Sequence, residues 1–441
     1  MDRIPPEVLL HIFDFLDGPA PSQVRLRYQP SDDMLDVKPQ LLQSLKNASL
    51  VCRAWRILVL PILFRHILWR PKISSLRAFT MNPIPLLQFL ENNKLDRAVT
   101  TFTLIVDFVD NEAGARHITP EIRTVDLEWL WDQLFSVIDP LRFTIIAPPT
   151  TLAAFMSRML FLDDAWSFSI PYHILSLART TRGPSRDKSL ETHLSDLQLS
   201  PPEHDTRRAA QPASTSPPTG IRYRKPPACP LFTVRPWTSV LLNEGSSVSV
   251  YRTYEFFLRR PPSMLGALLG CEEHPNDSPL IPPTVVDFNY IAIFPLASHF
   301  EILVQHLPKV ERLFVQLTPG PESQLILDES EMHHVDSADL WMERNTAYSS
   351  LMRELTIAAS PMDHPGNWSS LQVFESGDTA DIDAWNMAVD FVKRSGVKDW
   401  KVEREGVFVK HDNDGRSPTV EREIDGHIAV AESPGGQILS V

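Results

Sequence analysis

The stretch IPPEVLLHIFDFLDG, residues 4–18, places more apolar surface around one short helix than a single neighbour can cover. Its two prolines suit a helix start, and Asp17-Gly18-Pro19 predicts the helix end. The polar side chains occupy a wedge of roughly 60°, while the apolar ones sweep about 220°, against the ~100° stripe that an edge helix needs. The helix therefore lies deep in its own protein, or it packs on its own core with one side and on another protein with the other. The apolar residues are Val8, Leu9, Leu10, Ile12, Phe13, Phe15 and Leu16.

Composition limits the class of protein. A chain of 441 residues predicts two domains or one elongated one, and 43% hydrophobic residues can form sizeable cores. The 42 basic and 55 acidic residues give a net charge of −13, which repels phosphate backbones, so we expect no nucleic-acid partner. Three distant cysteines, Cys52, Cys229 and Cys271, indicate reduced thiols and a cytoplasmic or nuclear location.

No stretch predicts a membrane span. The longest compact apolar run, ILVLPILF at residues 57–64, is shorter than a span requires, and we expect Pro61 to break or restart its helix. The N-terminus carries no basic region of the kind that begins a signal peptide. We therefore expect no membrane partner.

Periodicity and composition divide the chain into five parts. Residues 1–70 predict a helical module, and residues 73–178 alternate helical and strand patterns. Residues 179–230 are rich in Pro, Ser, Thr and charge, which predicts a disordered linker. Alternation returns over 231–410, and the acidic stretch 411–441 predicts a disordered tail. Whether the linker separates two bodies or loops out of one stays open at this point.

The alternation predicts particular helices and strands. The predicted helices of the body span residues 85–93, 126–138, 151–160, 299–307 and 383–396. The predicted strands span residues 100–108, 141–147, 247–258 and 284–294. The residues 19–39 between the first two helices of the module predict a polar loop punctuated by proline.

A recurring apolar triplet, spaced h-x-x-h-x-h, follows several helices and is expected to open a strand. Its copies are Val99/Phe102/Leu104, Ile138/Leu141/Phe143, Val310/Leu313/Val315, Met352/Leu355/Ile357, Trp368/Leu371/Val373 and Val397/Trp400/Val402. Each helix-strand unit would bury its apolar side by stacking on the next, as in a solenoid. The body thus resembles irregular, degenerate leucine-rich repeats of the α/β class (α+β overall with the helical module), and one ordinary α/β domain is the alternative.

Motifs for catalysis or metal binding are absent from the sequence. Three groups carry metal-capable side chains, but each lacks further ligands at suitable spacing. They are Cys271-Glu272-Glu273-His274, His333-His334 beside Glu331 and Asp336, and Asp412-Asn413-Asp414-Gly415. We expect no catalytic residues, no metal and no cofactor; an enzyme in the body is a remote alternative.

The predicted linker is locally basic against an acidic body. This pattern is compatible with contact to nucleic acid or to the protein's own acidic surface, and a solvated linker is the simpler interpretation. The basic residues are Arg179, Arg182, Arg186, Lys188, Arg207, Arg208, Arg222, Arg224 and Lys225.

Two segments of the helical module together resemble a known family. IPPEVLLHIFDFL at residues 4–16 resembles the opening of the F-box, and SLVCRAW at 49–55 resembles its second half. PILFRHI at 61–67 resembles the way in which many such domains close. This sequence departs from the pattern in having Ile4 where leucine is commoner, and in about 20 extra residues between the first two helices, a length that a surface loop tolerates.

The resemblance implies a trihelical F-box that docks on a Skp-type adaptor and, through it, on a cullin. The chain would then be the non-catalytic substrate receptor of an SCF-type ubiquitin ligase, directing an unknown target protein to proteasomal degradation. The residues expected to bind the adaptor are Ile4, Pro5, Val8, Leu9, Ile12, Phe13, Leu16, Leu50, Val51 and Trp55. The alternatives are a repeat-like interaction scaffold with no role in ubiquitination, and a helical module that merely caps the body.

Overall fold

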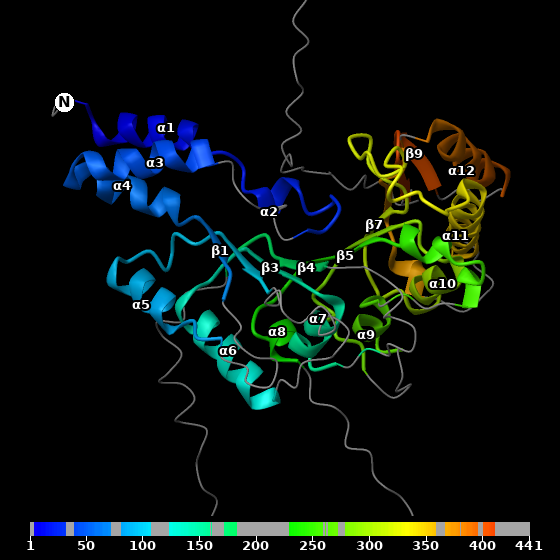
Figure 1. Cartoon of the computed structure of the whole chain (residues 1–441), viewed down its shortest axis with the longest axis horizontal. Coiled ribbons are helices and arrows are strands. Elements are labelled where there is room, and N and C mark those ends of the chain that lie inside the picture. The colour runs from blue at the N-terminus through cyan, green and yellow to red at the C-terminus, as the bar shows by residue number, and fades with distance from the viewer. Residues whose placement is uncertain are drawn as a thin grey trace, which may run out of the picture.

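The computed structural model forms an α/β body with a helical module at one end (Figure 1). It describes residues 4–31, 39–71, 81–106, 123–158, 160, 172–182, 229–258, 261, 263–271, 278–358, 367–379, 381–395 and 400–410. The predicted tail, 411–441, lies outside these residues. No helix of the described ranges is both long enough and apolar enough to cross a membrane.

The helical module comprises α1 (Pro6–Leu16), α2 (Pro21–Val24), α3 (Pro39–Val51) and α4 (Arg53–Leu63). Cys52 separates α3 from α4 because its backbone is extended, and its Sγ accepts a hydrogen bond from Trp55 N at 3.5 Å. The expected break at Pro61 is wrong. This proline lies in the last turn of α4, and the helix continues past it to Leu63 with one backbone donor missing.

A ten-stranded open sheet forms the body. Its strands are β1 (His66–Trp69), β2 (Thr101–Ile105), β3 (Arg142–Ala147), β4 (His173–Ala178), β5 (Ser239–Ser246), β6 (Asp287–Ile293), β7 (Arg312–Gln316), β8 (Val373–Ser376), β9 (Trp400–Arg404) and β10 (Val407–Lys410). Their spatial order is β1-β2-β3-β4-β5-β6-β7-β8-β10-β9. Strands β1, β2 and β3 run parallel to one another, and so do strands β5, β6, β7 and β8. The β3–β4, β4–β5, β8–β10 and β9–β10 pairs are antiparallel.

Helices cover one face of the sheet and form the main core with it. They are α5 (Ile84–Asn92), α6 (Thr124–Val137), α7 (Pro149–Phe155), α8 (Pro230–Thr233), α9 (Leu265–Leu269), α10 (Ala297–His306), α11 (Ser337–Ala358) and α12 (Ile382–Arg394). Figure 1 shows α5 to α9 in one layer below the sheet. A row of apolar side chains points into this layer, and the rings of Phe102 and Phe143 stack within it at 5.6 Å.

The opposite face carries a smaller apolar cluster without such a helical layer. It includes Ile105, Ile146 and Leu241 of the sheet, which alternate along their strands with side chains of the main core. The 3-10 helices η3 (Val248–Arg252) and η4 (Phe256–Leu258) pack on it. Residues 247–258, predicted as a strand, form these two 3-10 helices instead. The strand prediction is therefore wrong. It rested on the alternation of apolar residues, but here the buried ones pack over the sheet from 3-10 helices.

Four of the apolar triplets lie at the start of a strand, as expected. They are the copies beginning at Val99, Ile138, Val310 and Trp368, the last of which begins within η5 (Asn367–Ser370). The copy at Met352 is wrong, because it lies inside the 22-residue helix α11, where a spacing of three also fits one helical face. Of the sixth copy, Val397 lies outside the described residues and Trp400 begins β9. The α/β class is confirmed, but the mixed strand directions differ from the uniformly parallel sheet of leucine-rich repeats.

The long segment 179–230 joins two neighbouring strands of one sheet. β4 ends at Ala178 and pairs with β5, and Thr238 N donates to Ala178 O at 2.8 Å. The described strands on either side of residues 183–228 therefore belong to one continuous sheet. Residues 183–228, which include the basic residues from Arg186 to Lys225, lie outside the described ranges.

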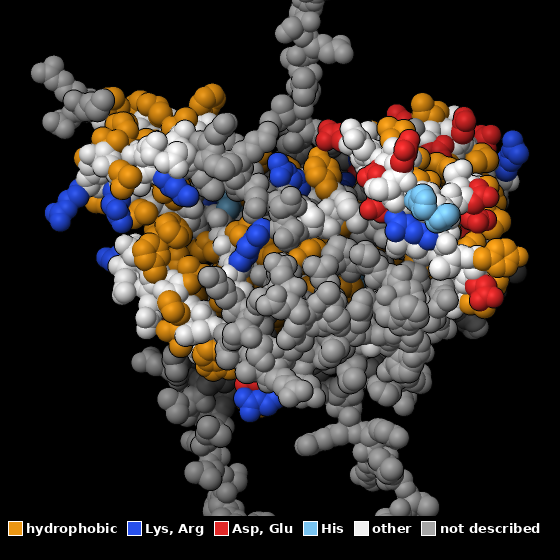
Figure 2. Space-filling view, in the orientation of Figure 1, with side chains coloured by type: hydrophobic (Ala, Val, Ile, Leu, Met, Phe, Trp, Pro, Cys, Tyr) orange, Lys and Arg blue, Asp and Glu red, His pale blue; other side chains and the backbone are white. Residues whose placement is uncertain are grey.

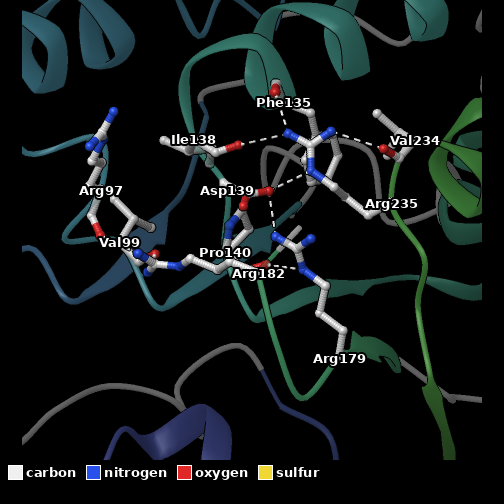
Figure 3. Close-up of polar contacts among 10 residues, drawn as sticks. All are labelled: Arg97, Val99, Phe135, Ile138, Asp139, Pro140, Arg179, Arg182, Val234 and Arg235. Atoms are coloured by element: carbon white, nitrogen blue, oxygen red, sulfur yellow. Dashed lines mark hydrogen bonds and ion pairs between the residues drawn. The ribbon is translucent and has the colours of Figure 1, made fainter. Parts of the chain in front are cut away.

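Asp139 links the two ends of this excursion (Figure 3). Its carboxylate pairs with the Arg179 guanidinium at the departing end and with Arg235 Nε, at 2.6 Å, at the returning end. Arg235 also donates to Phe135 O at 2.6 Å, and Arg182 donates to Val99 O at 2.8 Å. Arg179 and Arg182, counted above in the basic linker, are thus held by the body.

Buried ionisable groups meet where β4, β5 and β6 approach α9 and α10. His173 is fully buried, and neither ring nitrogen has a hydrogen-bond partner within the described ranges. Burial lowers the pKa of His173 to about 4, and burial together with the Arg65 charge lowers the pKa of His66 to about 4. Both rings are therefore held neutral in the folded chain at pH values where they would bind a proton in the unfolded chain.

We expect Asp139→Asn to destabilise the protein by about 1–3 kcal/mol, because it leaves the guanidinium of Arg179, whose side chain is 2% exposed, without its charge partner. The partial exposure of Asp139 keeps this loss below that of a fully buried pair. Urea unfolding measures it. The matched control is Asp126→Asn, whose partner Arg123 is exposed and whose loss should leave the unfolding midpoint unchanged. Equal midpoints for the two variants would refute the structural role of Asp139.

Stability should fall as the pH drops from about 6.5 to about 4. Over this window the unfolded chain takes up a proton at His173 that the folded chain refuses, which costs up to about 1.4 kcal/mol per pH unit. His173→Leu should flatten this dependence, as measured by urea unfolding at several pH values. His306→Leu, at an exposed position of α10, is the matched variant for the loss of one imidazole. An unaltered pH dependence in His173→Leu would contradict the prediction.

Candidate functional site

One side of α1 forms the core of the helical module. Leu9 and Phe13 are buried against α3 and α4, and the Phe13 and Trp55 rings meet edge to face at 5.3 Å. The other members of this core are Leu45, Ala48, Val59 and Ile62. The module itself therefore covers only the side of α1 that carries Leu9 and Phe13.

The remaining apolar side chains of α1 are exposed. Val8, Ile12 and Phe15 lie at i, i+4 and i+7, and Phe15 is 89% exposed. Ile4, Leu10 and Leu16 are exposed as well, as is Pro5. Figure 2 shows hydrophobic side chains gathered over this module, at the upper left of the molecule. We call the set Ile4, Val8, Ile12, Phe15 and Leu16 the apolar flank of α1.

The junction of α3 and α4 exposes further apolar residues. Leu50 and Val51, at the end of α3, are 75% and 55% exposed. Trp55 is half-buried, because one part of its ring packs on Phe13. Ile57 of α4 is 71% exposed.

The ten predicted adaptor-binding residues thus divide by exposure. Two of them, Leu9 and Phe13, belong to the core of the module, and Trp55 lies at its margin. The seven exposed ones are Ile4, Pro5, Val8, Ile12, Leu16, Leu50 and Val51. The prediction omitted Phe15 and Ile57, although the helical spacing of Phe15 from Val8 and Ile12 was a signal that could have identified it.

Arg65 fixes the end of α1 relative to the body. Its guanidinium pairs with Asp14 at 2.8 Å and with Asp17 at 3.2 Å. Burial raises the pKa of Asp17, and the charge of Arg65 offsets part of this effect. Two carboxylates at a helix C-terminus oppose the helix dipole, so the cation also compensates an unfavourable arrangement. The carboxylates at the end of this helix therefore pair within the chain, whereas the apolar flank of α1 stays exposed.

The predicted metal-capable groups do not form a site among the described residues. No group of three or more His, Cys, Asp or Glu side chains within those ranges could hold a metal ion. The His333 and His334 rings contact each other at 3.8 Å between centroids in an exposed loop. Of the four residues from Cys271 to His274, only the cysteine lies in the described ranges, and residues 412–415 lie outside them.

A buried polar cluster surrounds Glu244 and was not predicted from the sequence. Its carboxylate accepts hydrogen bonds from Ser263 Oγ at 2.6 Å and from Tyr290 Oη at 2.8 Å, and His299 Nε2 lies 3.1 Å away. Burial alone would raise the pKa of Glu244, but His299, His173 and Ser263 lower it to about 2. No short sequence motif joins these residues, because they come from four different segments.

This cluster combines a hydroxyl, an imidazole and a carboxylate, yet its geometry is that of a structural support. Ser263 Oγ and Glu244 both approach the same nitrogen of His299, so the ring does not relay a proton between them. Glu244 also accepts from Met264 N and Leu265 N, at 2.6 and 3.0 Å, and so caps α9. The carboxylate therefore fixes α9 on the sheet.

Comparison with known proteins identifies the helical module. The family model described as F-box-like matches residues 1–70. No curated protein and no solved structure matches the chain. The match covers α1 to α4 and β1, and so includes the three segments in which the F-box resemblance was found. The chain therefore carries an F-box-like domain at its N-terminal residues 1–70.

Proposed function

We propose that this protein is the substrate-recognition subunit of an SCF-type, cullin-RING ubiquitin ligase. The F-box would bind a Skp-type adaptor, which links it to a cullin, and the α/β body would hold the target protein. The observation that carries this proposal is the apolar flank of α1, which stays exposed although the module has a complete core of its own. An exposed apolar patch of this kind is typical of a protein-protein interface.

The chain would act by proximity. F-box proteins are typically non-catalytic receptors, and this one would hold a target lysine near a charged ubiquitin carrier. Such tethering raises the effective concentration of the reacting groups without adding a catalytic group. The reaction would take place in the cytoplasm or nucleus and lead to proteasomal degradation.

The exposure of each residue suggests its role in the adaptor interface. Val8, Ile12 and Phe15 would insert into the adaptor, while Leu9 and Phe13 hold α1 in place from behind. Each large apolar side chain that becomes fully buried contributes about 1.5–3 kcal/mol, from which the cost of association is subtracted. A few such anchors suffice for a stable complex.

The body would present the target-binding surface. We propose that it is an irregular leucine-rich-repeat-like structure, because its helix-strand units follow one another across the sheet and four of the triplets open strands. Its antiparallel pairs would then be departures from a regular repeat.

Ile12→Glu should weaken binding of a Skp-type adaptor at least tenfold, or about 1.4 kcal/mol, because it places a charge in the apolar interface. The measurement is titration calorimetry or quantitative pull-down with the full chain. His11→Glu is the matched control. It adds a carboxylate to the neighbouring exposed position, on the polar side of the same helix, and should bind as the wild type does.

Thermal unfolding of both variants checks that the module stays folded, since neither side chain is in its core. Adaptor binding by Ile12→Glu that equals the wild type would exclude the flank as the interface. A wild-type chain that binds no Skp-type adaptor would favour the alternative, an interaction scaffold without a role in ubiquitination.

A further inference from the structure

Part of the insertion that departs from the F-box pattern lies across the sheet. Its described part after α1, residues 19–31, contains α2 and extends from the module over the central strands (Figure 1). We call this segment the strap. Ala20, Ser22, Leu26 and Pro30 are buried although a surface loop was expected.

The first part of the strap contacts the sheet near β2. Ser22 Oγ lies 3.4 Å from Thr101 Oγ1. Leu26 is 3% exposed and belongs to the apolar cluster on the face that has no layer of helices. Because that cluster also includes Ile105 and Ile146, the strap contributes a side chain to the body's own packing.

The centre of the strap is held by a buried amide. Asn243 of β5 donates from Nδ2 to Leu26 O and to Tyr28 O, both at 2.8 Å, and its Oδ1 accepts from Gly245 N. Gly245 has a φ of +73°, and a Cβ there would lie 3.0 Å from Gln29 Nε2. The strand thus combines a donor for two strap carbonyls with a glycine that lets the strap approach closely.

The last part of the strap reaches β6 and β7. The Arg27 guanidinium lies 3.7 Å from the centre of the Phe314 ring, and its Nη2 is 3.5 Å from Asn289 Oδ1. Tyr28 Oη donates to Glu322 at 3.4 Å. The segment therefore contacts side chains from β2 across to β7.

A separate attachment joins the module to the edge of the sheet. α4 leads into β1 through Phe64 and Arg65, and Arg65 O accepts from Thr100 N at 2.7 Å. The Phe64 and Phe89 rings pack at 5.1 Å. The attachment at the edge strand β1 alone would let the helical module rotate relative to the body. The second attachment, the strap over β5 to β7, prevents this rotation.

We propose that the strap is an intramolecular docking segment that locks the F-box in one orientation on the body. The locked orientation determines where a target on the body faces relative to the adaptor. This consequence depends on the function proposed above, but the orientation itself is a property of the chain alone and is tested without an adaptor.

Asn243→Asp tests the lock. The substitution keeps the size of the side chain and the acceptor for Gly245 N, but it directs a carboxylate at two carbonyl oxygens in place of a donor. Asn345→Asp is the matched control. It adds the same charge at an exposed position of α11, where the side chain remains an acceptor for Arg344.

Spin labels at Lys46→Cys in α3 and Glu301→Cys in α10, both exposed, report the orientation in the full chain after Cys52→Ser and Cys271→Ser. Double electron-electron resonance should give one narrow distance distribution for the otherwise unchanged chain and for Asn345→Asp. For Asn243→Asp the distribution should become at least twice as wide. Arg27→Glu, which removes the contact with Phe314 at the strap surface, should widen it in the same direction.

A narrow distribution in both strap variants, with hydrogen exchange showing the strap backbone released, would overturn the inference. If Asn243→Asp unfolds, Arg27→Glu alone decides the outcome. Adaptor binding is measured separately on the same variants and should be unchanged, because the apolar flank of α1 is not touched. A failure of the adaptor proposal is thereby distinguished from a failure of the lock.

Discussion

The two-sided apolar character of α1 is the constraint on which the organisation of the module depends. Leu9 and Phe13 anchor the helix in its own core, and the neighbouring positions Val8 and Ile12 stay in solvent. Adjacent residues of a helix point about 100° apart, so no rotation of α1 buries both sets against α3 and α4 together. Burial of the flank needs a second surface, and the described part of the chain places none there. The adaptor interface proposed above rests on this geometry rather than on the length or charge of the chain.

The continuous sheet relates this module to the rest of the molecule. β1 begins three residues after α4 ends, so only Phe64 and Arg65 separate the last helix of the module from the first strand. β4 pairs with β5, so the strands before and after the long segment 179–230 are neighbours in the sheet. Asp139 forms an ion pair with Arg179 at the start of this segment and with Arg235 just after it. A segment of that length changes the closure entropy only slowly once its ends are fixed, which explains how the body accommodates it.

Local patterns predicted those parts of the fold that local burial determines. The triplets at Val99 and Val310 mark real strands, because buried residues there follow a helix and a tight turn. At Met352 the first two positions of the same spacing lie on the buried face of α11, while Ile357 is exposed. Residues 247–258 alternate without belonging to the sheet. For the proposed adaptor surface, the sequence identified the apolar residues of α1. It did not show which of them belong to the core of the module and which to the apolar flank, since this division depends on where α3 and α4 lie. Asn243 and Gly245 gave no sequence signal, because their meaning depends on a segment more than 200 residues away.

The insertion shows why a departure from a family pattern can be structural. Doubling the length of a loop raises the entropic cost of closing it by only about 0.6 kcal/mol. Against this, burial of a leucine such as Leu26 contributes about 1.5–3 kcal/mol, and each hydrogen bond from Asn243 contributes about 1 kcal/mol. These contributions oppose the entropy that is lost when the strap becomes ordered. On the lock proposed above, the loss of two hydrogen bonds shifts the strap toward undocked orientations. On this proposal, the orientation of the F-box on the body depends on Asn243 and Gly245 of β5, which lie outside the apolar flank of α1.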